Sequence, residues 1–284
     1  MAYQSYPSDL TDAEWAIVSL LVPKPKTNGR HATISRRSLL NAMFYVTKTG
    51  CGWEWLPREF PNYKTVYHYF RLWRLTGVWQ AIHTILREMV RQALGRNRQP
   101  SAAIIDSQSV KTTSVGGERG YDGGKKINGR KRHLVVDTQG LVLAVKVHAA
   151  NIADRDGASL VLSGLPERFP DIKKLWTDSG YNGSFQTWAA QHLPNWDVEI
   201  VKHWWTGIKG VWVGPGQEPP TIPSGFHVLP KRWIVERSLA WLGQNRRLSK
   251  DYERLTTTSE AFIYLAMSRL MVRRLAHLQA ASVK

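Results

Sequence analysis

Two aspartates stand at matching places in the sequence, each directly after a short apolar run. Asp106 follows an Ala-Ala-Ile-Ile run at 102–105, and Asp178 follows Leu-Trp-Thr at 175–177. If these runs are neighbouring strands of one sheet, the two carboxylates emerge side by side at its edge and repel each other. A divalent cation relieves that repulsion, and Mg²⁺ normally takes one or two carboxylates together with water and phosphate. The pair therefore predicts a metal site that acts on phosphate, with a third acid nearby.

Glu236 is the candidate for that third acid. It lies in a helical pattern from Lys231 to Ser249, whose apolar stripe can pack on the sheet. At about 100° per residue, Glu236 falls at the edge of the stripe, on a face that also carries Arg232 and Arg247. A carboxylate placed there can reach a metal ion at the sheet edge, and the two arginines can hold phosphate oxygens.

The elements that must position these acids follow an α/β pattern after residue 96. Short apolar or alternating runs predict five strands, at 102–105, 133–137, 141–147, 174–177 and 197–202. Helical runs follow at 154–165, 182–192, 231–249 and 257–275. Antiparallel strands come first and crossover helices later, which predicts a mixed five-stranded sheet flanked by helices.

Residues 203–230 interrupt this pattern. They are rich in Trp, Gly and Pro and show no periodicity, so we expect a loop or insertion there. Its tryptophans Trp204, Trp205 and Trp212 either stack on an unpaired base or pin the loop to the core, and the residues favour both interpretations equally.

Residues 1–95 predict an all-helical domain. Thr11 to Glu14 form a capping box, and Ser35 and Asn62 stand where two further helices begin. The second and third helices, joined by a tight connection, form either a helix-turn-helix for a DNA groove or part of a bundle that packs on the next domain. The polar sides of these helices carry cations that we expect to contact DNA: Arg36, Arg37, Lys64, Arg71 and Arg74.

A cationic, glycine-rich stretch at 120–133 separates the first two strands. We interpret it as a flexible loop that grips phosphate beside the acids, the alternative being an exposed hairpin. Asp122 in this stretch is expected to be solvated. Asp154 and Asp156 are interpreted as the start of a helix, from which either could still orient a metal ligand. The cations of the stretch are Lys125, Lys126, Arg130, Lys131 and Arg132.

The overall charge indicates a polyanionic partner. Lys and Arg total 39 against 22 acidic residues, for a net charge of +17, which favours nucleic acid over a mere contribution to solubility. The single cysteine, Cys51, can form no internal disulfide and no Cys-rich zinc site, so a reducing cytoplasm is expected. No apolar leader opens the sequence, and no run approaches the roughly 20 apolar residues that cross a bilayer, so we expect neither a secreted nor a membrane protein.

The order strand-Asp, strand-Asp, helix-Glu on this string of elements resembles the RNase H-like DDE transposases. The segments IIDSQSVKT at 104–112, WTDSGY at 176–181 and RWIVERSLAWLGQNRRLSKDYE at 232–253 look like those of bacterial insertion-sequence transposases of the IS-four/IS-five supergroup, IS-five branch. The opening LTDAEWAIVSLLVP and the segment GCGWEWLPREFPNYKTVYHYFRLWR at 50–74 look like the amino-terminal domain of that branch. The resemblance spans about residues 8 to 275 and implies an RNase H-like catalytic domain at 96–284.

This resemblance assigns the catalytic acids to Asp106, Asp178 and Glu236. Of the signature Y-x2-R-x3-E-x6-K, Arg232 and Glu236 fit, whereas leucine and glycine stand at the Tyr and Lys places. Arg246 or Arg247, one turn further on, is the candidate for the missing cation.

The activity that the resemblance implies is metal-dependent cleavage at insertion-sequence ends and strand transfer into target DNA, by two Mg²⁺ or Mn²⁺ ions. The implied partners are double-stranded DNA, as terminal inverted repeats and target, and further copies of the chain in a homodimer or larger synaptic complex. The implied location is the bacterial cytoplasm, in association with the nucleoid.

Two other functions fit the same residues. A DNA-binding repressor with a vestigial RNase H-like domain would bind element ends without nicking them. A stand-alone metal-dependent nuclease would hydrolyse DNA without joining a 3′-hydroxyl to a second duplex.

Overall fold

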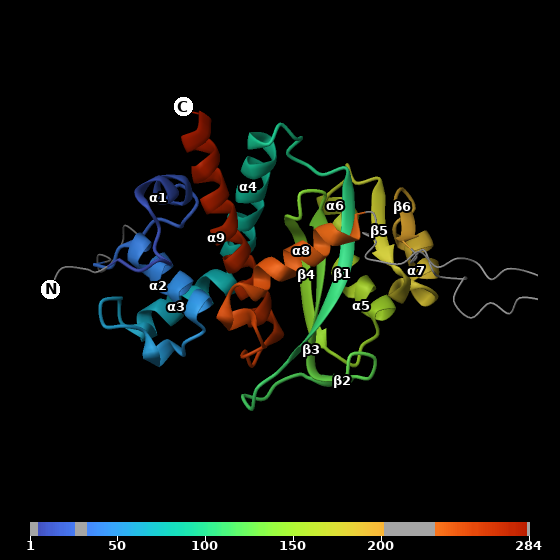
Figure 1. Ribbon diagram of the computed structural model, residues 1–284, viewed down its shortest axis with the longest axis horizontal. Helices are drawn as coiled ribbons and strands as arrows, with labels where there is room; N and C mark the ends of the chain where they lie inside the picture. Colours follow the sequence, from blue (N-terminus) through green and yellow to red (C-terminus); the bar gives the residue numbers. More distant parts are fainter. Residues whose placement is uncertain (1–4, 26–32, 202–230, 283–284) are drawn as a thin grey trace, which may run out of the picture.

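The computed structural model describes residues 5–25, 33–201 and 231–282, which fold into a helical part and an α/β part (Figure 1). The predicted insertion, with Trp204, Trp205 and Trp212, lies outside the described residues. None of the helices within the described ranges combines the length and the apolar composition needed to cross a membrane.

Four helices form the amino-terminal part, and they begin where the sequence predicts. The Thr11 hydroxyl accepts from the Glu14 amide in a complete capping box, and Ser35 and Asn62 cap the second and third helices. Gly50, at φ 75°, ends the second helix in the left-handed conformation that glycine adopts without strain. The helices are α1 (Asp12–Val18), α2 (Arg36–Thr49), α3 (Tyr63–Leu75) and α4 (Val78–Ala93).

The connection between α2 and α3 is longer than predicted. It runs from Gly50 to Asn62 and contains the 3-10 helix η1 (Trp53–Trp55). The expectation of a tight helix-turn-helix connection is therefore wrong. Backbone hydrogen bonds close two turns within it, from the Leu56 amide to the Trp53 carbonyl and from the Phe60 amide to the Pro57 carbonyl.

The sheet is mixed, as predicted, and it has six strands in the described residues. β3 pairs antiparallel with β1, β2 and β4, whereas β1, β5 and β6 run parallel. Asp137 closes the β3–β4 hairpin by accepting from the amides of Gln139 and Leu141. The strands are β1 (Ala102–Lys111), β2 (Gly120–Asp122), β3 (Ile127–Asp137), β4 (Val142–Ala149), β5 (Lys174–Asp178) and β6 (Asp197–Val201).

Two of these strands differ from their predicted bounds. β1 continues past Asp106 to Lys111, so Asp106 lies within the strand and not after it. β3 begins at Ile127 and pairs residue by residue with this extension of β1, which turns much of the predicted glycine-rich loop into sheet. The sixth strand, β2, covers a further three residues of that stretch.

Helices cover both faces of the sheet. Successive side chains of its strands point to opposite faces and contribute to two separate hydrophobic clusters. Ile105 and Val135 pack with α5 (Asp154–Leu162), α6 (Leu165–Arg168) and α7 (Ser184–His192). Ile104 and Val136 face the opposite way, toward α8 (Arg232–Gly243) and α9 (Thr256–Ser282).

α8 and α9 differ from the predicted helices at their ends. α8 stops at Gly243 and not at Ser249, and the 3-10 helix η3 (Arg246–Leu248) follows. α9 begins at Thr256, and the Glu260 carboxylate accepts from the Val147 amide of β4.

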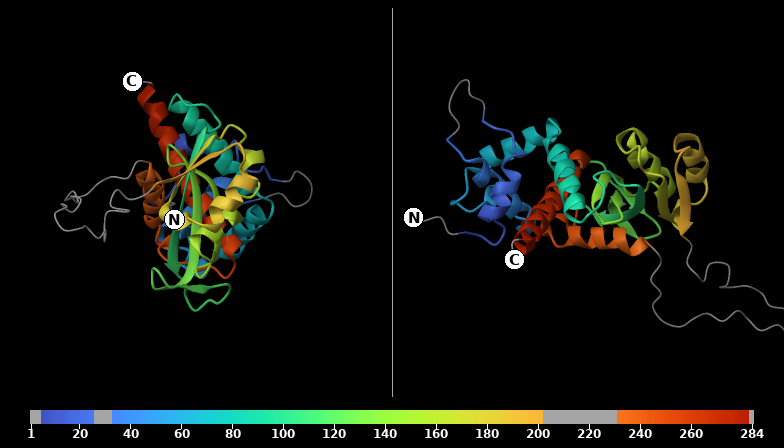
Figure 2. Two further views of the ribbon diagram at one scale, coloured as in Figure 1. Left: turned by 90° about the vertical axis from the view of Figure 1, so that its right-hand side faces the viewer. Right: turned by 90° about the horizontal axis from the view of Figure 1, so that it is seen from above.

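The hydrophobic core crosses the predicted boundary near residue 95. α9 lies beside α4, between α1–α3 and the sheet, and its buried side chains belong to the same cluster as those of α1–α4 and of one sheet face (Figures 1 and 2). Phe262 of α9 packs on Phe70 of α3, with ring centroids 4.6 Å apart. The amino-terminal helices and the sheet are therefore held together by one shared helix.

Candidate active site

β1 and β5 bring two of the predicted acids to the same level of the sheet. The strands are parallel neighbours, and Ile104 of β1 lies opposite Trp176 of β5. Two residues further along each strand stand Asp106 and Asp178, on the face that Ile104 shares with α8, since side chains alternate with a period of two. The expectation that the two runs are adjacent strands is confirmed.

α8 carries the third acid, Glu236, and an arginine that lies near all three acids. Arg232 and Glu236 are one helical turn apart, and Nη2 of Arg232 lies 3.3 Å from the Glu236 carboxylate. The same nitrogen lies 3.4 Å from Asp178 and 3.9 Å from Asp106. All three acids thus converge on a single guanidinium nitrogen.

The electrostatics of this cluster favour an added cation. Burial raises the pKa of Asp106 to about 6, and the negative charge of Asp178 contributes in the same direction. The Ser107 amide and the charges of Arg232 and Lys125 oppose that rise without cancelling it. The Glu236 side chain is 54% exposed, so it can adjust toward a ligand.

Backbone amides orient the two strand carboxylates. The Ser107 N–H donates to Oδ1 of Asp106 at 2.7 Å. The Gly180 N–H donates to Oδ1 of Asp178 at 2.8 Å, in the short 3-10 helix η2 (Ser179–Tyr181) that Asp178 caps. Each carboxylate is therefore held by the strand or turn that carries it.

The donor set fits a hard divalent cation. Within the described ranges, no three Asp, Glu, His or Cys side chains are grouped so that they could hold a metal ion as they stand. A guanidinium nitrogen marks the point that the three carboxylates share, so the site already accommodates positive charge there. Mg²⁺ needs only one or two carboxylates beside water and phosphate, which Asp106, Asp178 and Glu236 supply.

Three cations of the predicted phosphate-gripping loop are buried in β3, so that prediction is wrong for them. Arg130 donates to the carboxylate of Asp251 and to the carbonyls of residues 118, 253 and 254. Arg132 donates to the carbonyls of residues 248 and 250, and Lys131 lies 2.8 Å from the Asp154 carboxylate. The two arginines donate hydrogen bonds to the segment between α8 and α9, and Lys131 pairs with the first residue of α5. Because all three side chains are buried in these contacts, they cannot also contact DNA.

The remaining residues of that stretch divide between solvent and interior. Lys125 and Lys126 are exposed in the turn between β2 and β3. Asp122, expected to be solvated, is buried, and it accepts from the Ser109 hydroxyl and from the amides of Gly124 and Lys125.

Arg247 also has a structural role. Because α8 ends at Gly243, Arg247 does not continue the face of Glu236. It pairs with Glu253 at 2.7 Å and donates to the carbonyl of Cys51, so the expectation that it holds phosphate is wrong. Arg246 beside it is exposed on η3.

The cations of the amino-terminal helices fall into two groups. Arg36 donates to the Pro23 carbonyl, Arg37 pairs with Asp12, and Arg74 donates to Thr257. The other two, Lys64 and Arg71, are exposed on α3.

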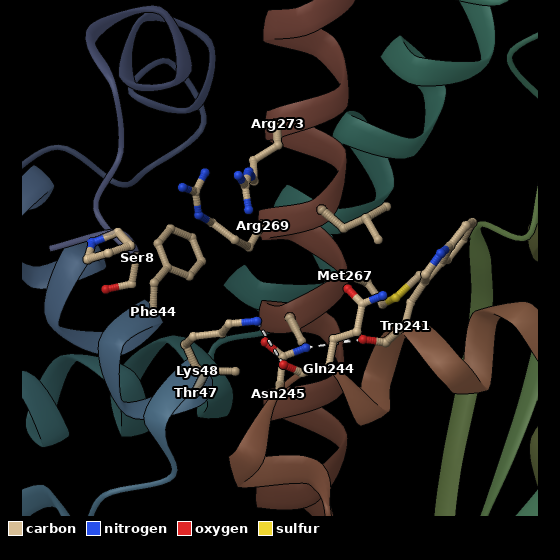
Figure 3. Close-up of a pocket in the computed structure, with 13 residues that line it drawn as sticks. Ser8, Phe44, Thr47, Lys48, Trp241, Gln244, Asn245, Met267, Arg269 and Arg273 are labelled. Atoms are coloured by element: carbon tan, nitrogen blue, oxygen red, sulfur yellow. Dashed lines mark hydrogen bonds between the residues drawn. The ribbon is translucent and has the colours of Figure 1, made fainter.

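A pocket of about 200 Å³ lies between the amino-terminal helices and α8–α9, and none of the three acids lines it (Figure 3). Phe44, Trp241 and Met267 form apolar walls, and Lys48, Arg269 and Arg273 line it as well. No acidic residue lines it.

Asp154 makes a long-range contact that the sequence does not reveal. It stands at the start of α5, as predicted, but the capping residue is Ala153, and the Asp154 carboxylate accepts from the hydroxyl of Ser107, next to Asp106. These partners stand 47 residues apart, and no local spacing announces their contact.

Comparisons with known proteins identify the family. A model described as transposase of IS4/5 family matches residues 10–83, and a model described as transposase DDE domain matches residues 97–271. The "Insertion element IS402 uncharacterized 16.2 kDa protein" of Burkholderia cepacia is 30% identical over 117 residues, which are 39% of this chain and 78% of that protein. No solved structure matches. The DDE match covers more than half of the chain, which therefore belongs to the DDE transposases of the IS4/IS5 family.

Proposed function

We propose that Asp106, Asp178 and Glu236 are the catalytic acids of this transposase, a DNA-cleaving and strand-transferring enzyme that uses divalent metal ions. The observation that carries the assignment is their convergence on one nitrogen of Arg232. Three carboxylates from two strands and a helix meet at a point where a cation already stands.

In the proposed mechanism, Asp106 and Asp178 hold the ions from the sheet and Glu236 completes the second position from α8. Two Mg²⁺ or Mn²⁺ ions would activate the attacking oxygen and stabilise the leaving oxygen of an in-line displacement. The amides of Ser107 and Gly180 fix the orientation of the two aspartates. No covalent intermediate between protein and DNA is needed.

Arg232 changes partner in this proposal. Once Asp106, Asp178 and Glu236 held a divalent cation, they would no longer need the Arg232 guanidinium to neutralise them. Arg232, which remains on the first turn of α8, then pairs with phosphate oxygens of the DNA, to which its planar fork is suited.

The proposed DNA path follows the exposed cations. Lys125 and Lys126 lie in the turn that follows β2, Arg246 lies on η3, and Lys64 and Arg71 lie on α3. Their charge supports contacts to the phosphate backbone, whose strength falls with salt. Lys125, which donates to Ser107, and Arg36, Arg37 and Arg74 are proposed as secondary contacts, because each is already engaged within the protein.

The resemblance of the motifs to the IS-five branch supports the finer features of the proposal. These are terminal inverted repeats and target DNA as substrates, a homodimer or larger synaptic complex, and a place in the bacterial cytoplasm beside the nucleoid.

A strand-transfer assay tests the proposal. Labelled duplexes that carry the terminal sequences of the encoding element are incubated with target DNA, with and without Mg²⁺. Asp106→Asn, Asp178→Asn and Glu236→Gln are each expected to abolish cleavage and joining, and Glu199→Gln, which alters an acid of β6 bonded to Trp176, is expected to retain both. A Glu236→Gln protein that joins ends like the parent would overturn the assignment of that glutamate.

The same assay separates the two other functions. A repressor binds the ends but cleaves nothing with any metal. A nuclease cleaves in Mg²⁺ yet leaves no product in which the 3′ end is joined to target.

A further inference from the structure

A fourth carboxylate lies against the catalytic site from the opposite face of the sheet. Oδ1 of Asp154, in the first turn of α5, accepts from the Ser107 hydroxyl at 2.7 Å. Side chains alternate along β1, so Ser107 faces α5 while its neighbour Asp106 faces α8. Asp154 thus reaches the residue next to a catalytic acid without entering the face where the acids converge.

Gly180 separates the second oxygen of Asp154 from Asp178. A methyl group added at Gly180 would lie 3.0 Å from Oδ1 of Asp178 and 3.6 Å from Oδ2 of Asp154. The two carboxylates therefore flank one glycine, on the turn that follows β5. Asp154 lies beside both catalytic strands at the level where they carry their acids.

A buried tyrosine lies among the same carboxylates. Tyr181 is fully buried, and burial together with the negative charges of Asp106, Asp154 and Asp178 raises its pKa well above the ordinary value. Its hydroxyl keeps its proton and lies in the field of all three acids. Asp154 therefore belongs to the same electrostatic group as the catalytic pair.

The position of Asp154 is fixed by buried groups on β3 and β4. Lys131 is buried, and its ammonium lies 2.8 Å from Oδ1 of Asp154. Below the first turn of α5, His133 and His148 share a hydrogen bond of 2.8 Å. Gly157 lets the helix approach that pair, since a methyl group there would lie 2.4 Å from the His133 ring.

We propose that Asp154 is a positioning residue of the catalytic site, which acts through Ser107. Its carboxylate holds the Ser107 side chain, and the Ser107 amide in turn donates to Oδ1 of Asp106 at 2.7 Å. This chain of two hydrogen bonds fixes which oxygen of Asp106 is turned away from the backbone. The inference rests on the proposed role of Asp106 as a metal ligand.

Charge gives Asp154 a second effect on the site. The ammonium of Lys125 lies within 3.4 Å of the Ser107 hydroxyl, and the buried Lys131 lies on the other side of the same chain of hydrogen bonds, 2.8 Å from Asp154. Asp154 neutralises Lys131. Without the Asp154 carboxylate, Lys131 keeps only the more distant carboxylate of Asp122, at 3.6 Å, so its buried positive charge is compensated less well and cation binding weakens.

Asp154→Asn tests the proposal, with Asp156→Asn as its matched control. Both aspartates stand in the first turn of α5, so both changes remove the same favourable interaction with the helix dipole. Asp156 likewise accepts one serine hydroxyl, from Ser184 at 3.1 Å, but lies outside the chain to Asp106. The measurement is the dissociation constant for Mn²⁺ without DNA, by calorimetry or by electron paramagnetic resonance, with melting temperatures alongside.

The expected result is Mn²⁺ binding roughly 10- to 100-fold weaker in Asp154→Asn, the range seen when groups behind metal ligands are altered, and unchanged binding in Asp156→Asn. Ser107→Ala leaves the ion pair of Asp154 and Lys131 in place. It therefore tests the two hydrogen bonds from Asp154 to Asp106 even if Asp154→Asn folds poorly. It should weaken Mn²⁺ binding in the same direction. The double variant should bind no more weakly than Asp154→Asn, because both changes break one chain.

Two outcomes overturn the inference, and they are distinguishable. If Asp106→Asn abolishes Mn²⁺ binding while Asp154→Asn and Ser107→Ala bind like the parent, Asp154 does not position the site. If Asp106→Asn also binds Mn²⁺ like the parent, the assignment of Asp106 itself is wrong, and the role of Asp154 falls with it.

Discussion

The guanidinium of Arg232 lies 3.4 Å from the carboxylate of Asp178, so the first turn of α8 supplies a cation at the end of β5. The arginine side chain is only 15% exposed, and a poorly hydrated cation among carboxylates interacts with them strongly. Without metal, this contact offsets the mutual repulsion of the acids. Under the proposed assignment, a metal ion would compete with the guanidinium for the same oxygens.

Arg232→Gln is expected to make the metal-free protein less stable and its response to metal larger. The loss of the shared cation should lower the free energy of unfolding by about 1–2 kcal/mol, because the carboxylates are left to repel each other. Mn²⁺ should then raise the melting temperature more than it does in the parent, since no guanidinium has to be displaced. Thermal melts with and without Mn²⁺ measure both effects, and Arg246→Gln, which removes an exposed cation, serves as control. Equal Mn²⁺ responses in all three proteins would contradict the competition.

Asp106→Asn is expected to stabilise the metal-free protein at neutral pH. Burial raises the pKa of Asp106 to about 6 from 3.8, so the folded state favours the protonated form. The stability linked to that proton is fully present below about pH 4 and is lost as the pH rises through about 6. At about 1.4 kcal/mol per pKa unit, the asparagine variant should exceed the parent by up to about 3 kcal/mol above pH 7.

Chemical denaturation in a chelator at several pH values measures this difference. The stability curves of Asp106→Asn and the parent should meet near pH 4. Glu236→Gln, which alters an exposed acid of the same cluster, should follow the parent throughout. A constant offset between Asp106→Asn and the parent at every pH would point to packing and not to ionisation.

The sequence predicted those features of the fold that local patterns determine. The caps at Thr11, Ser35 and Asn62 and the mixed sheet follow from spacing and capping chemistry within a few residues. The adjacency of the strands that carry Asp106 and Asp178 was the condition on which the predicted site depended, and the structure meets it. The catalytic role of these acids remains a prediction.

Features that depend on residues far apart in the sequence could not be predicted from local patterns. A run of lysines and arginines among glycines is typical of a solvated loop, yet Arg130 and Arg132 are buried because carbonyls more than 110 residues away accept from them. The same holds for α9, whose pattern indicates a core helix but not that it faces both parts of the chain. Asp154 and Ser107 meet only once the sheet has formed.

Arg130→Met is expected to destabilise the protein without lowering its affinity for DNA. The change leaves Asp251 buried without its cation and removes the donors to the carbonyls of residues 253 and 254. Breaking one partner of a buried ion pair lowers the free energy of unfolding by about 3–5 kcal/mol. Urea denaturation measures that loss, and the slope of DNA affinity against salt concentration should equal that of the parent.

Lys126→Asn is expected to show the reverse pattern. Lys126 is exposed and adopts φ 53°, a left-handed conformation that asparagine tolerates, so the turn is kept. Losing one phosphate contact should reduce the salt slope by about one and leave the free energy of unfolding unchanged. An unchanged slope would remove Lys126 from the proposed DNA path.

Phe262→Ala is expected to loosen the amino-terminal helices and the sheet together. Phe262 is fully buried, and its ring packs on Phe70 at 4.6 Å and near Trp53 at 6.0 Å, so the change leaves a cavity where α9 meets α3 and η1. A truncation of this kind lowers the free energy of unfolding by about 3–5 kcal/mol. Because one core serves both parts, hydrogen exchange should speed up for amides of α3 and of β3 alike. Leu72→Ala, which shortens an exposed side chain of α3, should change neither. Faster exchange in α3 with full protection retained in β3 would mean that the two parts unfold independently, and that α9 does not couple them.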